Sequence, residues 1–368
     1  MLDVERSSPL DRASPSTLRM LETCHLQVAL SRQATGSAAA WNAHAAVGDA
    51  CHRILALLVA SHALEADGWQ TALEDAWGGQ ARAMTEQALS HGIATPPERW
   101  PGVELTRARL RVVARRVRDL LHDAGPGAEA LTELSLRSAD GLLGGRIDLV
   151  VAGPRRHAVV DYKTGATVDP LSGRIREDYE AQLEIYAYLE AERSGSWPSE
   201  ALLLPFNGPP VSITVDSSAC GERAKTARAL LAQYNRIAPG PQPASPTPGG
   251  CAICAYAVAC DAFWAAADAS WAPQTVAVEG RLAQVTPSEL GTINMRILVK
   301  RGSGQLGACL IRAVRPQEHP GARSAAIGNR VRATGLRAEP DRGSYALPAW
   351  GHLAVLADTP PPTALVTA

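Results

Sequence analysis

The sequence predicts an α/β protein, with a mixed sheet flanked by helices in its first part and a small all-β barrel in its second. Three observations lead to this prediction. Helical periodicity dominates residues 14–123, strand-like runs alternate with helices over residues 129–237, and five short strand-like runs follow Trp271. Because 368 residues are enough for two domains, we expect one domain over residues 1–271 and another over 272–368.

The first segment is expected to be helical. SPSTLRMLETCHLQVAL opens with serine and threonine, which cap helix N termini, and ELTRARLRVVARRVRDLLHDA follows a helical period until AGPGAEA breaks it. The second of these helices is rich in arginine and could supply a basic surface or be a solvated face. Its arginines are Arg107, Arg109, Arg111, Arg115, Arg116 and Arg118.

Two short apolar runs next bring acidic residues together. Residues 145–151 contain Asp148, and residues 157–162 contain Asp161, which is followed by Lys163; the intervening GPRR predicts a hairpin turn. Two carboxylates can hold a hard divalent cation, and a lysine can orient the attacking water or neutralise phosphate charge. The alternative is that both aspartates cap turns and Lys163 is an ordinary ion-pair partner.

A helix is expected over residues 177–193, two strands within 200–215 and a helix over 218–237. Gln182 and Tyr186 are four residues apart in the first helix and therefore share a face. A proline-rich spacer, APGPQPASPTPGG, then leads to the cysteine segment CAICAYAVAC.

The last part of the chain contains five strand-like runs, typical of a Greek-key barrel of the OB type: TVAVEGRLAQV, TINMRILVK, QLGACLIRAV, NRVRATGLRAE and YALPAWGHLAVL. From Thr275 onward the sequence contains 11 Lys and Arg residues but only 6 Asp and Glu residues, although the whole chain has a net charge of −1. OB domains often stack bases on aromatics over a basic groove. The candidate DNA contacts are Arg296, Lys300, Arg301, Arg330, Arg332, Arg337, Tyr345 and Trp350. The alternative is a barrel that docks a protein partner or the first domain.

The cysteines predict a metal or cluster site. The N-terminus lacks an apolar signal region and no run approaches a membrane span, so we expect a cytoplasmic protein, in which disulfides are rare. Cys251, Cys254 and Cys260 then have ligand spacing and need a fourth partner. Three other cysteines, Cys51, Cys220 and Cys309, lack partners at ligand spacing and are expected to be small buried hydrophobes.

Six motifs in order resemble the RecB-like branch of the PD-(D/E)XK nucleases. They are SPSTLRMLETC, GDACH, GRIDLV, VVDYKTG, QLEIY and the cysteine trio, and they span residues 14–264. The closer resemblance is to the iron–sulfur subset, which includes AddB-type nuclease domains and CRISPR-associated RecB-like nucleases. The resemblance implies a restriction-endonuclease-like mixed sheet for the first domain.

The resemblance also implies roles for individual residues. Asp148 and Asp161 would bind the metal, His52 would be an additional ligand, and the backbone carbonyl of Tyr162 would complete the metal shell. Lys163 would be the catalytic lysine. Without this context, His52 on its helix would be an ordinary core or surface histidine.

Three further residues match the family pattern around this site. Gln182 and Tyr186 would shape the site and contact DNA near the scissile phosphate, unless they are plain helix-face residues. Glu133, in the strand before the hairpin, would support the site and is not counted among the expected metal ligands.

The family pairs an upstream cysteine with the downstream trio, which makes Cys24 the implied fourth ligand. Four thiolates would then hold a [4Fe–4S] cluster. A structural zinc ion on the same ligands is the chemical alternative, because four cysteines also suit zinc. A third alternative is that the cysteines are buried and bind nothing.

The resemblance implies an Mg²⁺- or Mn²⁺-dependent deoxyribonuclease, expected to act as an exonuclease, that serves DNA repair, recombination or defence against foreign DNA. The chain lacks GxxxxGK[ST], so an ATP-driven helicase would be a separate partner. One alternative is a DNA-binding subunit of a helicase–nuclease assembly whose cleavage is silent or partner-activated. Another is a zinc-stapled RNA-processing nuclease. No membrane partner is expected.

Overall fold

The structure is a computed structural model, and the chain in it divides into two compact units. It describes residues 7–33, 43–91, 95–100, 102–165, 167–168, 174–252, 254–272, 275–288, 291–316, 318–341, 343–348 and 351–356. The helix–sheet unit comprises Arg6–His25 and Ala43–Gln242, and the strand unit comprises Met1–Glu5, Leu26–Asn42 and Pro243–Ala368. The domain boundary expected after residue 271 stays a prediction.

The helix–sheet unit is built on a five-stranded mixed sheet. In spatial order its strands are β1 (Glu129–Arg137), β2 (Gly144–Ala152), β3 (His157–Lys163), β4 (Glu200–Pro205) and β5 (Val211–Thr214). Neighbours are antiparallel except β3 and β4, which are parallel and therefore need a crossover. This crossover contains α6 (Glu177–Ser194), and the mixed sheet flanked by helices is confirmed.

The predicted hairpin is formed by β2 and β3. Leu149 pairs with Val160, so Asp148 and Asp161 lie directly beyond this pair on neighbouring strands. The central part of β3 is buried, as expected for a strand covered on both faces. The hairpin therefore fixes both acids in the interior of the unit.

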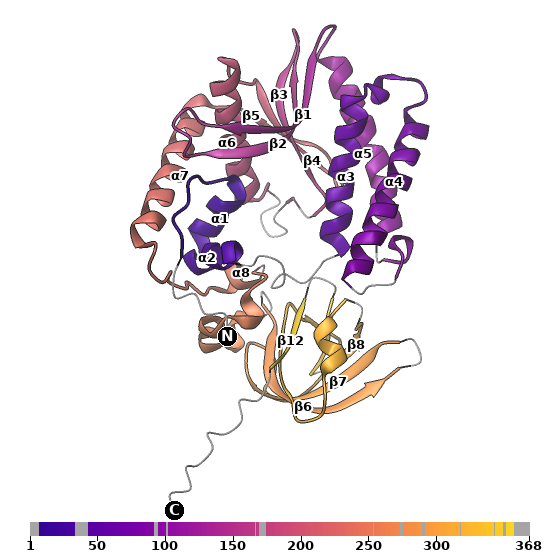
Figure 1. Ribbon diagram of the computed structural model, residues 1–368, viewed down its shortest axis with the longest axis vertical. Coiled ribbons are helices and arrows are strands. Elements are labelled where there is room, and N and C mark those ends of the chain that lie inside the picture. The colour runs from indigo at the N-terminus through magenta and orange to yellow at the C-terminus, as the bar shows by residue number, and fades with distance from the viewer. Residues whose placement is uncertain are drawn as a thin grey trace, which may run out of the picture. The chain divides into compact units, whose positions relative to one another are not determined.

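Helices cover both faces of this sheet (Figure 1). The long ones are α3 (Ala43–Ala60), α4 (Trp69–Ser90), α5 (Val103–Asp123), α6 and α7 (Ser217–Ile237), with short turns η1 (Ala63–Glu65) and η2 (Pro97–Arg99). In Figure 1, α3, α4 and α5 lie on one side of the sheet, and α6 and α7 lie on the other. Among the described residues, α3 is the one helix that could cross a membrane by length and composition, a property that buried core helices share.

The N-terminal helical run is divided in two at Cys24. Ser14 caps α1 (Pro15–Thr23) by accepting a hydrogen bond from the Thr17 backbone N–H at 3.3 Å, as predicted. Cys24 has an extended backbone, with φ of −162° and ψ of 111°, and α2 (His25–Gln33) follows it. A cysteine between two helices has its side chain at a helix end instead of on a helix face.

Close packing brings α3 against the end of β3. A Cβ atom on Gly48 would lie 3.2 Å from Oγ1 of Thr164, which follows Lys163 in the chain. Glycine at this point therefore allows the helix to approach the β2–β3 hairpin. His52 lies four residues, about one helical turn, further along α3.

Within the described residues, the strand unit has seven strands in place of the five expected. They are β6 (Ala277–Pro287), β7 (Ile293–Arg301), β8 (Gly307–Val314), β9 (Arg330–Thr334), β10 (Arg337–Ala338), β11 (Ser344–Ala346) and β12 (His352–Leu356). Their order is β10-β11-β8-β7-β6-β9-β12, and no pair among the described strands closes the sheet into a barrel. The fourth predicted run divides into β9 and β10 at Gly335, whose φ is +70°. The fifth divides into β11 and β12 around Pro348, which cannot donate a ladder hydrogen bond.

The strand unit also contains the short helices α8 (Pro248–Ala252) and α9 (Asp261–Ala266), with η3 (Ala257–Ala259), η4 (Ala269–Trp271) and η5 (Pro320–Ser324). Phe263, Trp264 and Trp271 form a small core with Ala277, at the start of β6. The cysteine segment is thus packed onto the sheet that follows it.

Candidate active site

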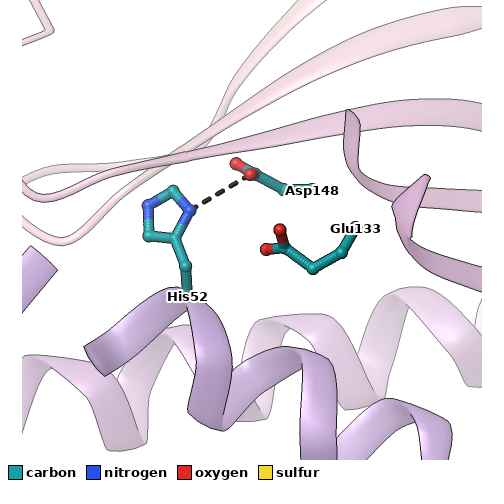
Figure 2. A group of neighbouring side chains, drawn as sticks. All are labelled: His52, Glu133 and Asp148. Carbon is teal, nitrogen blue, oxygen red and sulfur yellow. Dashed lines mark hydrogen bonds and ion pairs between the residues drawn. The ribbon is translucent and has the colours of Figure 1, made fainter. Parts of the chain in front are cut away.

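Asp148, on β2, has a different partner at each carboxylate oxygen. Its Oδ1 lies 3.1 Å from Nδ1 of His52 on α3, and its Oδ2 accepts a 2.7 Å hydrogen bond from the backbone N–H of Tyr162 on β3 (Figure 2). Asp148 is 7% exposed. These contacts offset the cost of burying the carboxylate and fix its orientation.

Burial lowers the pKa of His52, but its hydrogen bond to Asp148 and the nearby carboxylates outweigh this effect and raise the pKa. The His52 ring also lies edge-on to the Tyr162 ring, with centroids 5.6 Å apart. The structure therefore brings His52 into contact with one of the hairpin acids, Asp148, and its role as a metal ligand stays a prediction. The metal-binding role of the Tyr162 carbonyl stays a prediction.

Glu133, on β1, has an unusual backbone. Its φ is +51°, in the left-handed region that residues other than glycine rarely adopt. The strand ladder pairs Thr132 with Leu149 and Leu134 with Ile147, so Glu133 is opposite Asp148 by position but is skipped by the ladder. Backbone strain at a functional position is a recognised feature of active sites.

This conformation brings Glu133 into a group with His52 and Asp148. One ligand atom from each of the three lies within 4.8 Å of the others, as Figure 2 shows. Glu133 also forms a 2.8 Å ion pair with Nε of Arg146 on β2. The sequence placed Glu133 near the site but did not include it among the metal ligands, because spacing along a strand carries no information on φ.

Asp161 is 2% exposed and is held by two side chains. Its Oδ2 lies 2.6 Å from Nζ of Lys163, and its Oδ1 accepts a 2.9 Å hydrogen bond from Nε2 of Gln182 on α6. Burial raises the pKa of Asp161 to about 6, although the Lys163 ammonium opposes this shift. A buried acid beside a lysine can accept a cation once it is ionised.

Gln182 and Tyr186 share a face of α6, as predicted. Nε2 of Gln182 also lies 2.9 Å from the Tyr186 hydroxyl, which it reaches as a donor. A Cβ atom on Gly145 would lie 2.8 Å from the Tyr186 ring, so the glycine of the GRID motif makes room for this tyrosine. Burial raises the pKa of Tyr186, and the charge of Asp161 adds to the effect.

Tyr179 is a member of this site that the sequence did not reveal. It lies near the start of α6, and Nζ of Lys163 lies 5.0 Å from its ring centroid. A cation–π contact helps to hold the ammonium in one place. Tyr179 lies three residues before Gln182, and residues at this spacing share a helix face, so the sequence could have indicated that Tyr179 belongs to the site.

The candidate DNA contacts in the strand unit divide into exposed and buried residues. Arg296, Lys300 and Arg330 are exposed on β7 and β9. Arg332 is 4% exposed and cannot contact DNA as expected, because Glu279 and Asp261 bind its guanidinium at 2.6 and 2.8 Å. Trp350 lies outside the described residues.

The arginines of α5 are partly engaged within the helix–sheet unit. Arg107 and Arg111 both pair with Glu74 on α4, and Arg116 donates to the backbone carbonyls of Pro205 and Gly208 at 3.2 and 3.0 Å. These arginines stabilise the fold, which reduces the basic surface expected from this helix.

The predicted cluster ligands belong to both units. Cys24 lies in the helix–sheet unit, and Cys251, Cys254 and Cys260 pack against the aromatic core of the strand unit. All four are half-buried. The remaining three cysteines, Cys51, Cys220 and Cys309, are buried as expected, and burial raises the pKa of each thiol.

Comparison with known proteins identifies the family. No curated protein matches the chain. A solved structure titled "Crystal structure of SSO0001" matches 44% of this chain and 76% of its own at 16% identity, and its TM-score of 0.25 is too low to support an argument. A model of the PD-(D/E)XK nuclease superfamily matches residues 12–261, which include the whole site from His52 to Tyr186. Because this match covers more than half of the sequence, the chain belongs to the PD-(D/E)XK nuclease superfamily.

Proposed function

We propose that this protein is a Mg²⁺- or Mn²⁺-dependent deoxyribonuclease whose active site lies between α3, the β2–β3 hairpin and α6. The observation that carries the proposal is the Asp161–Lys163 contact beside the group formed by His52, Glu133 and Asp148. In a member of this superfamily, these are the groups needed to bind a cation and to act on a phosphodiester.

The donor atoms suit the proposed metal. Carboxylate oxygens bind Mg²⁺ and Mn²⁺, and an imidazole nitrogen beside them also suits Mn²⁺. Asp148 would hold the ion together with His52 and Glu133, whose ligand atoms lie near it. Asp161, on the neighbouring strand, would be the second acid of the site. When bound, such an ion lowers the pKa of a coordinated water and neutralises charge on the phosphate.

The side chains have distinct tasks in this proposal. The Lys163 ammonium, fixed by Asp161 and the Tyr179 ring, orients the attacking water or neutralises the phosphate. Gln182 keeps one oxygen of Asp161 in place, while the other oxygen pairs with Lys163. Arg146 balances the charge of Glu133 and lies where it can meet a phosphate, because its side chain is 68% exposed.

The proposed substrate is DNA with a free end or a single-stranded region, cut by exonuclease action in DNA repair, recombination or defence in the cytoplasm. A separate helicase or ATPase would be the partner. The alternative function is a DNA-binding subunit whose cleavage is silent or partner-activated. The 2.6 Å contact between Asp161 and Lys163 supports the active enzyme.

We also propose that the strand unit, as an OB-like domain, contacts the DNA backbone. Arg281 on β6 pairs directly with Arg330 on β9, and both are exposed. Like charges on opposed residues destabilise a sheet, so their juxtaposition is better explained by an anionic partner. Arg296 and Lys300 flank them on β7, where Leu298 pairs with Arg281.

Cys24, Cys251, Cys254 and Cys260 are proposed to hold a [4Fe–4S] cluster, with zinc as the alternative occupant. Support comes from the ligand spacing and from the shared half-buried state of the four thiols. Metal analysis of anaerobically purified protein, with its visible absorption spectrum, distinguishes iron and sulfide from zinc. Replacement of Cys254 by serine is expected to remove the bound metal.

The function is tested by incubating the purified protein with end-labelled single-stranded DNA, double-stranded DNA and RNA, each with Mg²⁺, Mn²⁺ or EDTA. Cleavage of DNA only in the presence of the divalent ion supports the proposal. Cleavage of RNA alone would support the RNA-processing alternative, and folded protein without activity would support the partner-dependent subunit.

A further inference from the structure

One side of α6 carries three polar residues at intervals of four: Gln182, Tyr186 and Glu190. The first two belong to the active site. Glu190 lies eight residues after Gln182 and has no exposed surface. Burying a carboxylate completely is costly unless it is paired, so the partners of Glu190 explain its presence.

Glu190 is bound by one residue of the sheet and one of its own helix. Its Oε1 lies 3.0 Å from Nε2 of His157, the first residue of β3. Arg193 donates to both carboxylate oxygens at 2.7 and 2.8 Å. The backbone carbonyl of His157 accepts hydrogen bonds from the N–H and the hydroxyl of Ser199, which anchors the histidine on the strand.

The spacings of the two elements match. His157 and Asp161 are four residues apart on β3, so they share a face and are separated by about 13 Å. Gln182 and Glu190 are eight residues apart on α6, a distance of about 12 Å along the axis. The contacts Asp161–Gln182 and His157–Glu190 therefore join the strand and the helix at both ends.

We propose that the His157–Glu190 pair is a positioning device for the active site. Buried residues of α6, such as Leu183 and Leu189, pack the helix in place, and the hydrogen bond from Gln182 to Asp161 fixes its position at one point. The second polar contact, about two helical turns away, further limits rotation and sliding of the helix and keeps the Gln182 amide against the carboxylate. The inference rests on the proposed function, since it assigns a role in the same site to two residues that do not touch it.

His157→Ala is the informative variant, because Glu190 keeps its Arg193 partner and is not left as an unpaired buried charge. His157→Gln restores a side-chain donor for Glu190. We expect His157→Ala to lower the single-turnover cleavage rate about tenfold to a hundredfold, with little change in KM for DNA. His157→Gln should recover most of this loss.

A double-variant cycle tests whether His157 acts through Gln182. If it does, adding His157→Ala to Gln182→Ala costs little beyond Gln182→Ala alone. Calorimetric titration with Mn²⁺, without DNA, should show weaker binding in His157→Ala because Asp161 is less well held. Glu184→Gln is the matched control: it alters another acid of α6, which pairs with Arg223 at 2.8 Å, and should leave rate and Mn²⁺ affinity unchanged.

Additive losses in the double variant would overturn the proposal. So would a His157→Ala protein that is less stable to heat but has the wild-type rate and Mn²⁺ affinity, since its role would then be structural only. A wild-type protein that does not cleave DNA contradicts the proposed function instead, and the Mn²⁺ titrations still test the positioning role.

Discussion

Single residues at this site combine favourable and costly features. Glu133 adopts a left-handed backbone conformation that costs free energy, and this conformation places its carboxylate beside His52 and Asp148. Asp161 is almost fully buried, and its pKa is raised because of this burial. The fold thus tolerates backbone strain at Glu133 and burial of the Asp161 carboxylate, two residues on which the proposed chemistry depends.

Replacing Glu133 should separate backbone strain from function. Glu133→Ala and Glu133→Gly both remove the carboxylate, but glycine adopts φ of +51° without strain. We expect the glycine variant to be more stable than the alanine variant by about 1 kcal/mol, and both to bind Mn²⁺ less tightly than wild type. Urea unfolding and calorimetry measure these two effects, and equal stabilities would show that the backbone of residue 133 is not strained.

Elements were predictable where the signal is local. The β2–β3 hairpin, the cap of α1 by Ser14 and the shared face of Gln182 and Tyr186 follow from alternation, capping and helical spacing. The left-handed backbone of Glu133 and the burial of Arg332 could not be predicted from these local patterns, because they depend on residues distant in sequence. Arg330 and Arg332 have the same alternation on β9, yet Asp261 and Trp264 of α9 contact only Arg332.

The segment after β8 contains a further buried titratable group, His319, which lies beside η5 and is 4% exposed. Burial lowers the pKa of His319 to about 4, so the unfolded chain binds a proton more readily than the folded protein. Stability from this residue is therefore present near neutral pH and is lost as pH falls through 6.5 towards 4. The loss amounts to about 2 kcal/mol between pH 7 and pH 5.

We expect His319→Gln to be less sensitive to acid than wild type over this range, as measured by urea unfolding at pH 7 and pH 5. His62→Gln, at a side chain that is 79% exposed, is the control and should keep the wild-type sensitivity. An unchanged difference between the two pH values in His319→Gln would contradict the assignment.

At the scale of the whole molecule, the two units offer different contributions to DNA processing. The helix–sheet unit contains every residue of the proposed catalytic site, and the strand unit presents the opposed Arg281 and Arg330. Net charge could not reveal this division, because the chain as a whole has a charge of −1. Cleavage and backbone binding should therefore be separable by mutation.

Replacing both Arg281 and Arg330 by alanine should weaken DNA binding in EDTA. It should also lower the slope of log affinity against log salt concentration by the amount expected for about two lost phosphate contacts. Fluorescence anisotropy with single-stranded DNA over a series of salt concentrations measures both quantities. Arg312→Ala, at an exposed arginine of β8 that pairs with Asp341 at 2.7 Å, is the control. If the double variant and this control bind alike, the opposed arginines do not contact DNA.

The central claim is that Asp161 and Lys163 form the catalytic centre of a metal-dependent nuclease. It is tested most directly by single-turnover cleavage of end-labelled DNA by Lys163→Met, beside wild type and Lys225→Met, which alters an exposed lysine of α7. We predict metal-dependent cleavage by wild type and Lys225→Met, and a rate at least about a hundredfold lower in folded Lys163→Met. Cleavage by Lys163→Met at the wild-type rate would contradict the account.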